Sequence, residues 1–316
     1  MVDIARGENC NCVVGAGGGS VIVASKGTAL TANNEGKTIQ YTTKEDGFPN
    51  PPLLCVIMPT NAGSGAEVSK GTTITDVKTG NKVRIRGYRH AVRLTILDPM
   101  LLVTVTRGQT IASGVDALTH ALEAYLSEKA SPLTDCVALK SIEMIVNNLC
   151  KSVFTVDIEA KGAMLLGSTM ANIAVSNSTV GLSHILNMVV TDIYKKRDLD
   201  YMAYGMIHAV LLPPTLEFNL AACPDKVAPL AQSMCMPVDS KSQAELIKGI
   251  MDRLDNILTD LSAPRKLIWK ELTPEDIIES GIKSGHLVLD TAKQDAHVIR
   301  KYTREDLVCI LSKVLS

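Results

Sequence analysis

The chain has 316 residues, 46% of them hydrophobic, and 32 Lys plus Arg against 33 Asp plus Glu give a formal net charge of −1. Balanced charge without a basic stripe interleaved with aromatics disfavours a nucleic-acid partner. No apolar run approaches a membrane span and no secretory leader pattern opens the chain, so we expect a cytoplasmic protein without a membrane partner. The eight cysteines show no CxxC spacing and are predicted to be reduced core residues.

A glycine-rich stretch near the N-terminus joins a predicted strand (residues 11–14) to a predicted helix (residues 21–30). Bare backbone N–H groups and the helix dipole at such a junction favour anions, and a dinucleotide pyrophosphate is the natural occupant. Glycines that serve only tight packing are the alternative. The candidate cofactor-binding residues here are Gly17, Gly18, Gly19 and Ser20.

A second loop of small residues follows a predicted buried strand over residues 51–58. Its hydroxyl, amide and backbone donors can reach a nucleotide, or can satisfy the backbone of their own turn. Its candidate cofactor contacts are Thr60, Asn61 and Ser64. Residues 72–76 and 82–85 are expected to form a hairpin, and residues 91–97 a further strand.

From about residue 106, helical periodicity replaces the strand pattern. The predicted helices span residues 109–127, 132–151, 157–177, 182–194, 204–219, 224–234, 242–261, 274–284 and 303–315. The last two begin with capping signals, Thr273 to Asp276 and Thr303 to Asp306. We therefore expect an α/β plus all-α fold, with a partial Rossmann-like nucleotide-binding domain over residues 1–105 and an all-helical domain over residues 106–316.

Asp116 and His120 lie four residues apart on the first long predicted helix. Both side chains then project from one face about a turn apart, where they can hold one divalent ion. An Asp near a helix start that pairs with a His one turn later is the alternative without metal. His184, in a second apolar and glycine-containing stretch, favours the metal site. The predicted ligands are Asp116, His120 and His184, which would make the all-helical domain the metal-binding one.

Residues 114–125, continued by residues 130–135, resemble the metal-binding signature of the iron-containing (group III) alcohol dehydrogenases. Further family landmarks follow in order at residues 14–20, 59–67, 96–99 and 209–213. The resemblance implies a metal-dependent oxidoreductase that uses NAD or NADP, Fe²⁺ or Zn²⁺, and a small-molecule alcohol or aldehyde. In the family one Asp and three His hold the metal, which acts as a Lewis acid while hydride passes to or from nicotinamide. A homo-oligomer is also expected.

The resemblance also carries over individual roles. The family uses the second loop on the cofactor, which implies that role for Thr60 and Ser64, and Lys82 stands where the family places a lysine near the cofactor; an exposed strand lysine is the alternative. The fourth metal ligand departs from the family, because Tyr204 occupies its position and His208 lies one turn further along the same predicted helix. Tyr204, His208 or water can complete the site, so Tyr204 and His208 are the catalytic candidates.

Other departures concern the cofactor and the substrate. Val23 replaces a usual acidic residue, and Met188 replaces a histidine near the substrate. Family members carry opening strand and helix units before the position of Val2, so a weaker hold on the adenosine half is expected. Two alternatives stay open: a redox-inactive descendant that performs metal-assisted elimination or cyclisation, and a non-catalytic scaffold. Among the other histidines, His90 is expected to be exposed and His286 to have no role as a ligand, while family analogy places His297 near the cleft.

Overall fold

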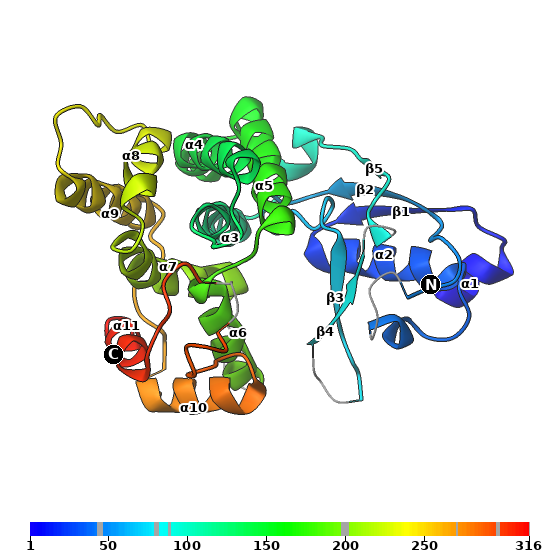
Figure 1. Ribbon diagram of the computed structural model, residues 1–316. Helices are drawn as coiled ribbons and strands as arrows, with labels where there is room; N and C mark the ends of the chain where they lie inside the picture. Colours follow the sequence, from blue (N-terminus) through cyan, green and yellow to red (C-terminus); the bar gives the residue numbers. More distant parts are fainter. Residues whose placement is uncertain are drawn as a thin grey trace.

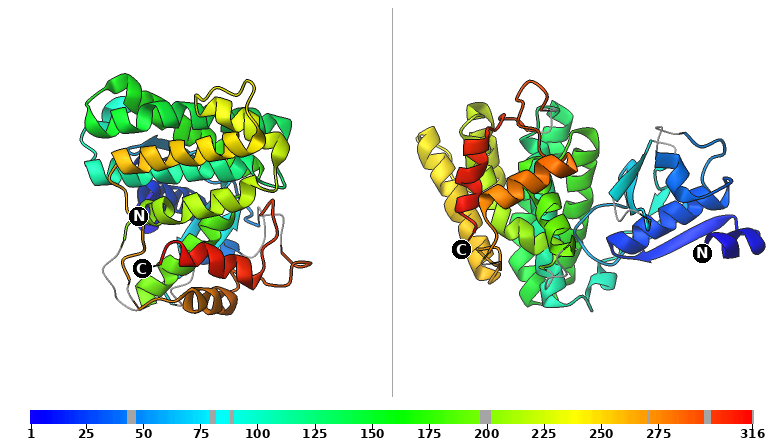
Figure 2. Two further views of the ribbon diagram at one scale, coloured as in Figure 1. Left: turned by 90° about the vertical axis from the view of Figure 1, so that its left-hand side faces the viewer. Right: turned by 90° about the horizontal axis from the view of Figure 1, so that it is seen from below.

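The computed structural model describes residues 1–42, 47–78, 82–87, 90–196, 202–269, 271–294 and 298–315. The first third of the chain forms an α/β lobe and the remainder a helical lobe, which lie side by side (Figure 1). The view from below shows the same division (Figure 2, right). The predicted fold class, α/β plus all-α, is confirmed. The domain boundary between residues 105 and 106 stays a prediction.

A small parallel sheet organises the α/β lobe. Its strands are β1 (Cys12–Gly17), β2 (Leu54–Pro59) and β5 (Leu94–Thr95), in the order β1-β2-β5. The inward residues Cys55 and Ile57 of β2 pack against Ile22 and Ala29 of α2 (Gly19–Ala32). A short helix, α1 (Val2–Gly7), precedes β1, and the short helices η1 (Thr38–Thr42) and η3 (Pro99–Leu102) lie in the connections.

The predicted hairpin is present as β3 (Gly71–Thr75) and β4 (Lys82–Arg86), paired antiparallel. It lies between the sheet and the helical lobe (Figure 1). The strand predicted over residues 91–97 is shorter than expected, because only Leu94 and Thr95 pair with β2, opposite Val56 and Ile57.

The glycine-rich stretch contributes fewer loop residues than the sequence suggests. β1 continues through Gly17, and α2 begins at Gly19 with Gly18 as its N-cap. A Cβ at Gly17 would lie 2.5 Å from Cβ of Val21, and one at Gly15 would overlap Ser25. At these two positions glycine therefore permits close packing of α2 on β1.

The helical lobe follows the predicted helices closely. Its helices are α3 (Arg107–Tyr125), α4 (Pro132–Phe154), α5 (Ile158–Asn177), α6 (Leu182–Lys196), α7 (Tyr204–Leu220), α8 (Pro224–Ser233), α9 (Gln243–Asp260), α10 (Pro274–Ser284) and α11 (Arg304–Ser312). The predicted starts of α10 and α11 are confirmed, since Thr273 and Thr303 each form a capping box with an Asp three residues on. Among the described helices, none alone has the length and apolarity of a membrane span; α5 and α6 reach them only as a pair, bent by 99°.

Helix α3 is the central element of the helical lobe and is buried along most of its length, from Ile111 to Tyr125. It packs against α4, α5 and α7 in one apolar core, while α6, α7, α10 and α11 share a second core. Because α7 contributes to both cores, its position relative to α3 and α6 is fixed from two sides.

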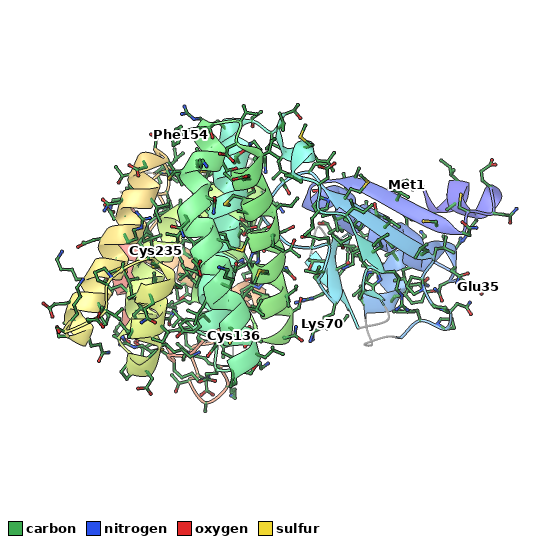
Figure 3. The ribbon with its side chains drawn as sticks, turned by 90° about the horizontal axis from the view of Figure 1, so that it is seen from above. Met1, Glu35, Lys70, Cys136, Phe154 and Cys235 are labelled. Carbon is green, nitrogen blue, oxygen red and sulfur yellow. The ribbon has the colours of Figure 1, made fainter. Side chains whose placement is uncertain are left out.

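The prediction that the cysteines are core residues is wrong for half of them. All eight carry free thiols, but Cys10, Cys136, Cys235 and Cys309 are exposed, and only Cys55 and Cys223 are buried. Figure 3 shows Cys136 and Cys235 on the helical lobe. Cys136 has apolar neighbours in the sequence but is exposed, because the buried side chains of α4, such as Ile142 and Leu149, lie on another face of the helix.

Candidate active site

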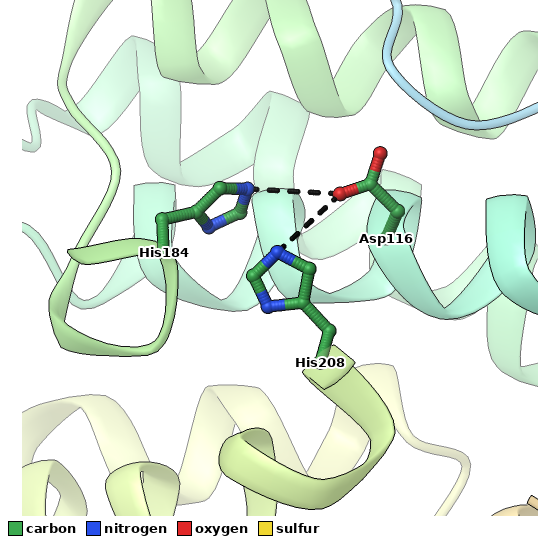
Figure 4. Close-up of side chains that lie close together, drawn as sticks. All are labelled: Asp116, His184 and His208. Atoms are coloured by element: carbon green, nitrogen blue, oxygen red, sulfur yellow. Dashed lines mark ion pairs between the residues drawn. The ribbon is translucent and has the colours of Figure 1, made fainter. Parts of the chain in front are cut away.

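Three helices bring one carboxylate and three imidazoles together. Asp116 and His120 project from α3, His184 from the first turn of α6, and His208 from the second turn of α7. The Oδ1 atom of Asp116 lies 3.6 Å from Nε2 of His208, 3.7 Å from Nε2 of His184 and 3.9 Å from Nδ1 of His120. Figure 4 shows His184 and His208 pointing at Asp116 from separate helices.

Three of these four atoms, those of Asp116, His184 and His208, are spaced like metal ligands, because they all lie within 4.8 Å of one another. All four are buried, and none has a hydrogen-bond partner among the residues that the structure describes. The three separations exceed hydrogen-bond length. Two ligands of a tetrahedral zinc, each about 2.1 Å from the ion, are about 3.4 Å apart. Buried polar atoms normally have partners, so a set of orphaned atoms around one point fits a divalent cation. Carboxylate and imidazole donors suit Fe²⁺ or Zn²⁺.

The predicted ligands occupy slightly different places in this group. Asp116, His184 and His208 offer ligand atoms that all lie within 4.8 Å of one another. His120 is beside them, with its ring centroid 4.4 Å from that of His184. The ring of Tyr204 lies 5.1 Å from that of His208 and 6.4 Å from that of His184. Of the two candidates for the fourth ligand, His208 is thus the one whose side-chain nitrogen reaches Asp116.

Glu123, on α3, orients His184 and was missed by the sequence analysis. Its carboxylate accepts hydrogen bonds from the backbone N–H groups of Gly181, Ser183 and His184, at 2.8, 2.7 and 3.3 Å, and pairs with Nδ1 of His184 at 2.5 Å. A carboxylate on the far nitrogen of a ligating histidine is a usual outer partner in metal sites. The sequence spacing could have indicated Glu123, because a residue seven positions after Asp116 lies on the same face of the helix.

Burial and the neighbouring charges set the protonation of this group. Burial lowers the pKa of His120 to about 4, and burial with the nearby His184 lowers that of His208. For His184 burial acts in the same direction, but the Glu123 carboxylate outweighs it and raises the pKa to about 9. Burial raises the pKa of Asp116, yet the surrounding imidazoles hold it below its ordinary value. His120 and His208 are thus neutral at pH 7, the form that can ligate a metal.

A cleft of about 1520 Å³ joins this group to the α/β lobe. Asp116, His120, His184 and Tyr204 line its helical side. The predicted cofactor residues on its other side are Gly18, Gly19, Ser20, Asn61 and Ser64. A Cβ at Gly18 would lie 3.0 Å from the Asn61 amide, and one at Gly19 3.3 Å from the Ser64 hydroxyl. The two loops therefore meet at the N-terminus of α2, where backbone N–H groups face the cleft.

Two predicted cofactor residues, Gly17 and Thr60, lie away from the cleft, and a third, Lys82, stays untested. Gly17 is buried within β1, and the N–H of Thr60 donates to its carbonyl at 3.1 Å; neither residue lines the cleft. Lys82 begins β4, but its side chain falls outside the described part of the structure. Val23, one of the departures from the family pattern, does line the cleft.

Two of the remaining histidines, His90 and His286, lie away from this group. The prediction that His90 is exposed is wrong: it is 3% exposed, and its ring lies 6.4 Å from that of Phe48. Basic neighbours in sequence did not reveal that the ring packs inward beside Lys26 and Cys55. His286 is partly exposed, with Nε2 3.5 Å from Asp192. His297 lies outside the described residues.

The chain matches two family models along nearly its whole length. Residues 1–99 match the model of iron-containing alcohol dehydrogenase, and residues 110–315 match that of the Fe-containing alcohol dehydrogenase family, C-terminal. The chain is 31% identical over 309 residues to the 1,3-propanediol dehydrogenase of Citrobacter freundii, covering 96% of this chain and 78% of that protein. It is 31% identical over 312 residues to the NAD-dependent methanol dehydrogenase of Bacillus methanolicus, covering 98% and 75%.

Solved structures of alcohol dehydrogenases share the fold of this chain. A crystal structure of 1,3-propanediol oxidoreductase matches with a TM-score of 0.87 and 29% identity, covering 98% of this chain and 78% of that one. An alcohol dehydrogenase from Oenococcus oeni matches with a TM-score of 0.87 and 25% identity, covering 99% and 79%. Both lobes are therefore shared with these proteins.

Proposed function

This chain is an oxidoreductase of the iron-containing alcohol dehydrogenase family, and from that premise we propose that it transfers hydride between a small alcohol or aldehyde and NAD beside a divalent cation. The observation that carries the proposal is the gathering of the buried, unpartnered ligand atoms of Asp116, His184 and His208, with that of His120 beside them, at a cleft that is also lined by the N-terminus of α2. The proposed ligands are Asp116, His120, His184 and His208.

In this proposal, the helical lobe holds the metal and the α/β lobe binds the dinucleotide. Lewis-acid polarisation of the substrate oxygen is the chemistry that Fe²⁺ or Zn²⁺ supplies in such a site. The backbone at Gly18 and Gly19, with the dipole of α2, binds the pyrophosphate of the dinucleotide. Asn61 and Ser64 supply side-chain donors at the same place. Tyr204 lines the cleft, and its ring lies 5.1 Å from that of His208, which supports a role for its phenol in hydrogen-bonding the substrate oxygen.

Several finer assignments belong to the same proposal. The similar methanol dehydrogenase is named NAD-dependent, which favours NAD over NADP. The names of the relatives, which include propanediol and methanol, favour small alcohols as substrates. Free thiols at all eight cysteines suit the reducing cytoplasm. A homo-oligomer without a nucleic-acid or membrane partner stays a prediction, which sedimentation velocity and binding assays can test.

The test is reconstitution with Fe²⁺ or Zn²⁺ without oxygen, followed by elemental analysis and by the absorbance of reduced nicotinamide with 1,3-propanediol and other short alcohols. We expect close to one metal per chain and alcohol-dependent reduction of NAD. Asp116→Ala should lose both, whereas the exposed Asp255→Ala should keep both, because Asp255 pairs with Arg265 at the surface. Wild-type protein that retains neither metal nor turnover would refute the proposal.

A second pair of variants separates the two candidates for the fourth ligand. His208→Ala removes a nitrogen that lies 3.6 Å from Asp116, so the metal affinity should fall by about ten- to a hundredfold. Tyr204→Phe keeps the ring and should keep the affinity while it lowers turnover. The opposite ranking would make Tyr204 the ligand.

Metal-assisted elimination or cyclisation is the second candidate function. Val23 lines the cleft where the family usually has an acidic residue, and this observation favours a changed cofactor contact. A metal-loaded protein whose melting temperature neither NAD nor NADP raises would support this candidate over hydride transfer.

A further inference from the structure

We propose that Ser183 is a positioning residue that selects which nitrogen of His208 faces Asp116 and the other ligand atoms, and that it thereby makes His208 the fourth ligand. This inference rests on the proposed metal site. It concerns a residue on α6 that acts through a histidine on α7.

The geometry places the two side chains in direct contact. The Oγ atom of Ser183 lies 3.0 Å from Nδ1 of His208, and both residues are fully buried. The other ring nitrogen, Nε2, lies 3.6 Å from Oδ1 of Asp116 and is one of the orphaned atoms of the ligand group. The serine thus occupies the far side of the ring from the ligand group.

This contact fixes the rotation of the ring, and it allows the tautomer that a ligand needs, because the Ser183 hydroxyl can accept a hydrogen bond from Nδ1. If the ring turned over, Nδ1 would exchange with a carbon, and a buried serine hydroxyl would lose its partner, which costs about 1–3 kcal/mol. In a neutral imidazole only one nitrogen carries hydrogen. When Nδ1 donates to the Ser183 hydroxyl, the lone pair is on Nε2 and points at the ligand group. A hydroxyl can accept this bond and still donate one of its own.

Glu123 holds Ser183 in place for this role. Its carboxylate accepts the backbone N–H of Ser183 at 2.7 Å and binds Nδ1 of His184, the next residue. One turn of α6 therefore supplies a ligand, His184, and the outer partner of another ligand, His208. Both histidines are held at Nδ1 and present Nε2 to Asp116. This shared orientation is the one expected when a single ion is bound between them.

The test compares Ser183→Ala with Ser141→Ala. Ser141 is also fully buried, and its hydroxyl donates to the Gly167 carbonyl at 2.7 Å, between α4 and α5 and away from the ligand group. Co²⁺ is titrated into each metal-free protein against a chelator while the visible spectrum is recorded. Ser183→Ala should bind Co²⁺ about ten- to a hundredfold more weakly, with an altered spectrum. Ser141→Ala should lose stability but keep the affinity and spectrum, and Ser183→Thr should restore both.

A measurement on the wild type keeps the inference testable if Ser183→Ala does not fold. In Zn²⁺-loaded protein with ¹⁵N-labelled histidine, His208 should show a proton on Nδ1 and none on Nε2. The reverse assignment overturns the inference, as does equal Co²⁺ binding by Ser183→Ala and Ser141→Ala. Wild-type protein that fails to bind Co²⁺ overturns the proposed metal site itself, which is a distinguishable result.

Discussion

At the scale of single residues, the site consists of ligands and of the groups that orient them. Glu123 is the residue that connects the two sets, because its carboxylate binds a ligand side chain and three backbone N–H groups at the start of α6. Burial alone would raise the pKa of Glu123, but the charge and hydrogen bonds of His184 lower it. Glu123 is therefore ionised, as an acceptor of four hydrogen bonds requires.

Glu123→Gln keeps the shape of the side chain and removes its charge. We expect the affinity for Zn²⁺ to fall by about ten- to a hundredfold, because Nδ1 of His184 loses its carboxylate partner. Competition with a chelator measures this change. Glu143→Gln is the matched control, since Glu143 pairs with Lys140 on the exposed face of α4. Similar affinities for the two variants would show that Glu123 does not orient His184.

The sequence predicted the ligands better than their supporting residues. Helical spacing alone placed Asp116 and His120 on one face of α3, and it placed His208 one turn beyond Tyr204. The choice between His208 and Tyr204 required the crossing of α3 and α7. Ser183 gave no signal, because its partner lies on a different helix.

At the scale of elements, the close approach of α7 to α3 sets the distance from His208 to Asp116. Gly205 lies at this crossing, and a Cβ there would overlap the backbone carbonyl of Ala112. Neither backbone can move away easily, because α7 contributes to both apolar cores. Glycine is thus required at this position for packing rather than for an unusual backbone conformation.

Gly205→Ala should destabilise the protein by about 3 kcal/mol, at the upper end for overpacking of a core, and should weaken metal binding as well. Urea denaturation and metal titration measure the two effects. Gly162→Ala on α5 is the control, because its Cβ would meet Pro99 at an ordinary 3.7 Å. That variant should be neutral or more stable by about 0.5–1 kcal/mol, since Ala favours a helix. Equal stability of the two variants would contradict the close crossing.

In the α/β lobe, Lys26 links α2 to the segment that leads into β3. Its side chain is 2% exposed, and Nζ donates to the carbonyls of Ser69 and Gly71 at 2.7 and 2.9 Å. Burial lowers the pKa of Lys26 from the ordinary 10.5 to about 8. Helix α2 and the segment from Ser69 to Gly71 both border the cleft, so Lys26 helps to hold the side of the cleft that the α/β lobe forms.

Lys26→Met should destabilise the lobe by about 2 kcal/mol, because the buried carbonyls of Ser69 and Gly71 each lose a charged donor. The difference in the free energy of unfolding between the wild type and Lys26→Met should grow as the pH rises. Between about pH 8 and 10.5 the unfolded chain still binds the proton that folded Lys26 has released, so wild-type stability rises relative to the variant. The slope is at most about 1.4 kcal/mol per pH unit. Urea denaturation at several pH values measures it, with the exposed Lys140→Met as control. A difference that does not change with pH would contradict the lowered pKa.

At the scale of the whole molecule, the two lobes, which lie side by side in Figure 1, contribute different walls to the cleft. Metal and dinucleotide should then bind through separate residues. In Asp116→Ala, NAD should still raise the melting temperature. In Gly19→Val, where the added side chain faces Ser64 at the proposed pyrophosphate site, the metal should still bind and the NAD shift should disappear.

At a hundredfold excess over its dissociation constant, NAD should stabilise the wild type by about 2.7 kcal/mol. Differential scanning fluorimetry of the two variants and the wild type measures the shifts. If each variant failed to bind both the metal and NAD, the two lobes would not bind them independently.

The sequence by itself determined the family, the order of the elements, the helix starts and the ligand types, because these depend on local periodicity, capping and short motifs. Only the tertiary structure decided that His208 meets Asp116, that Gly17 is buried within β1, and that Glu123 and Ser183 hold the ligand histidines. It also placed His90 in the interior. These features depend on which side chains meet across separate helices and strands, and no local spacing encodes that distance.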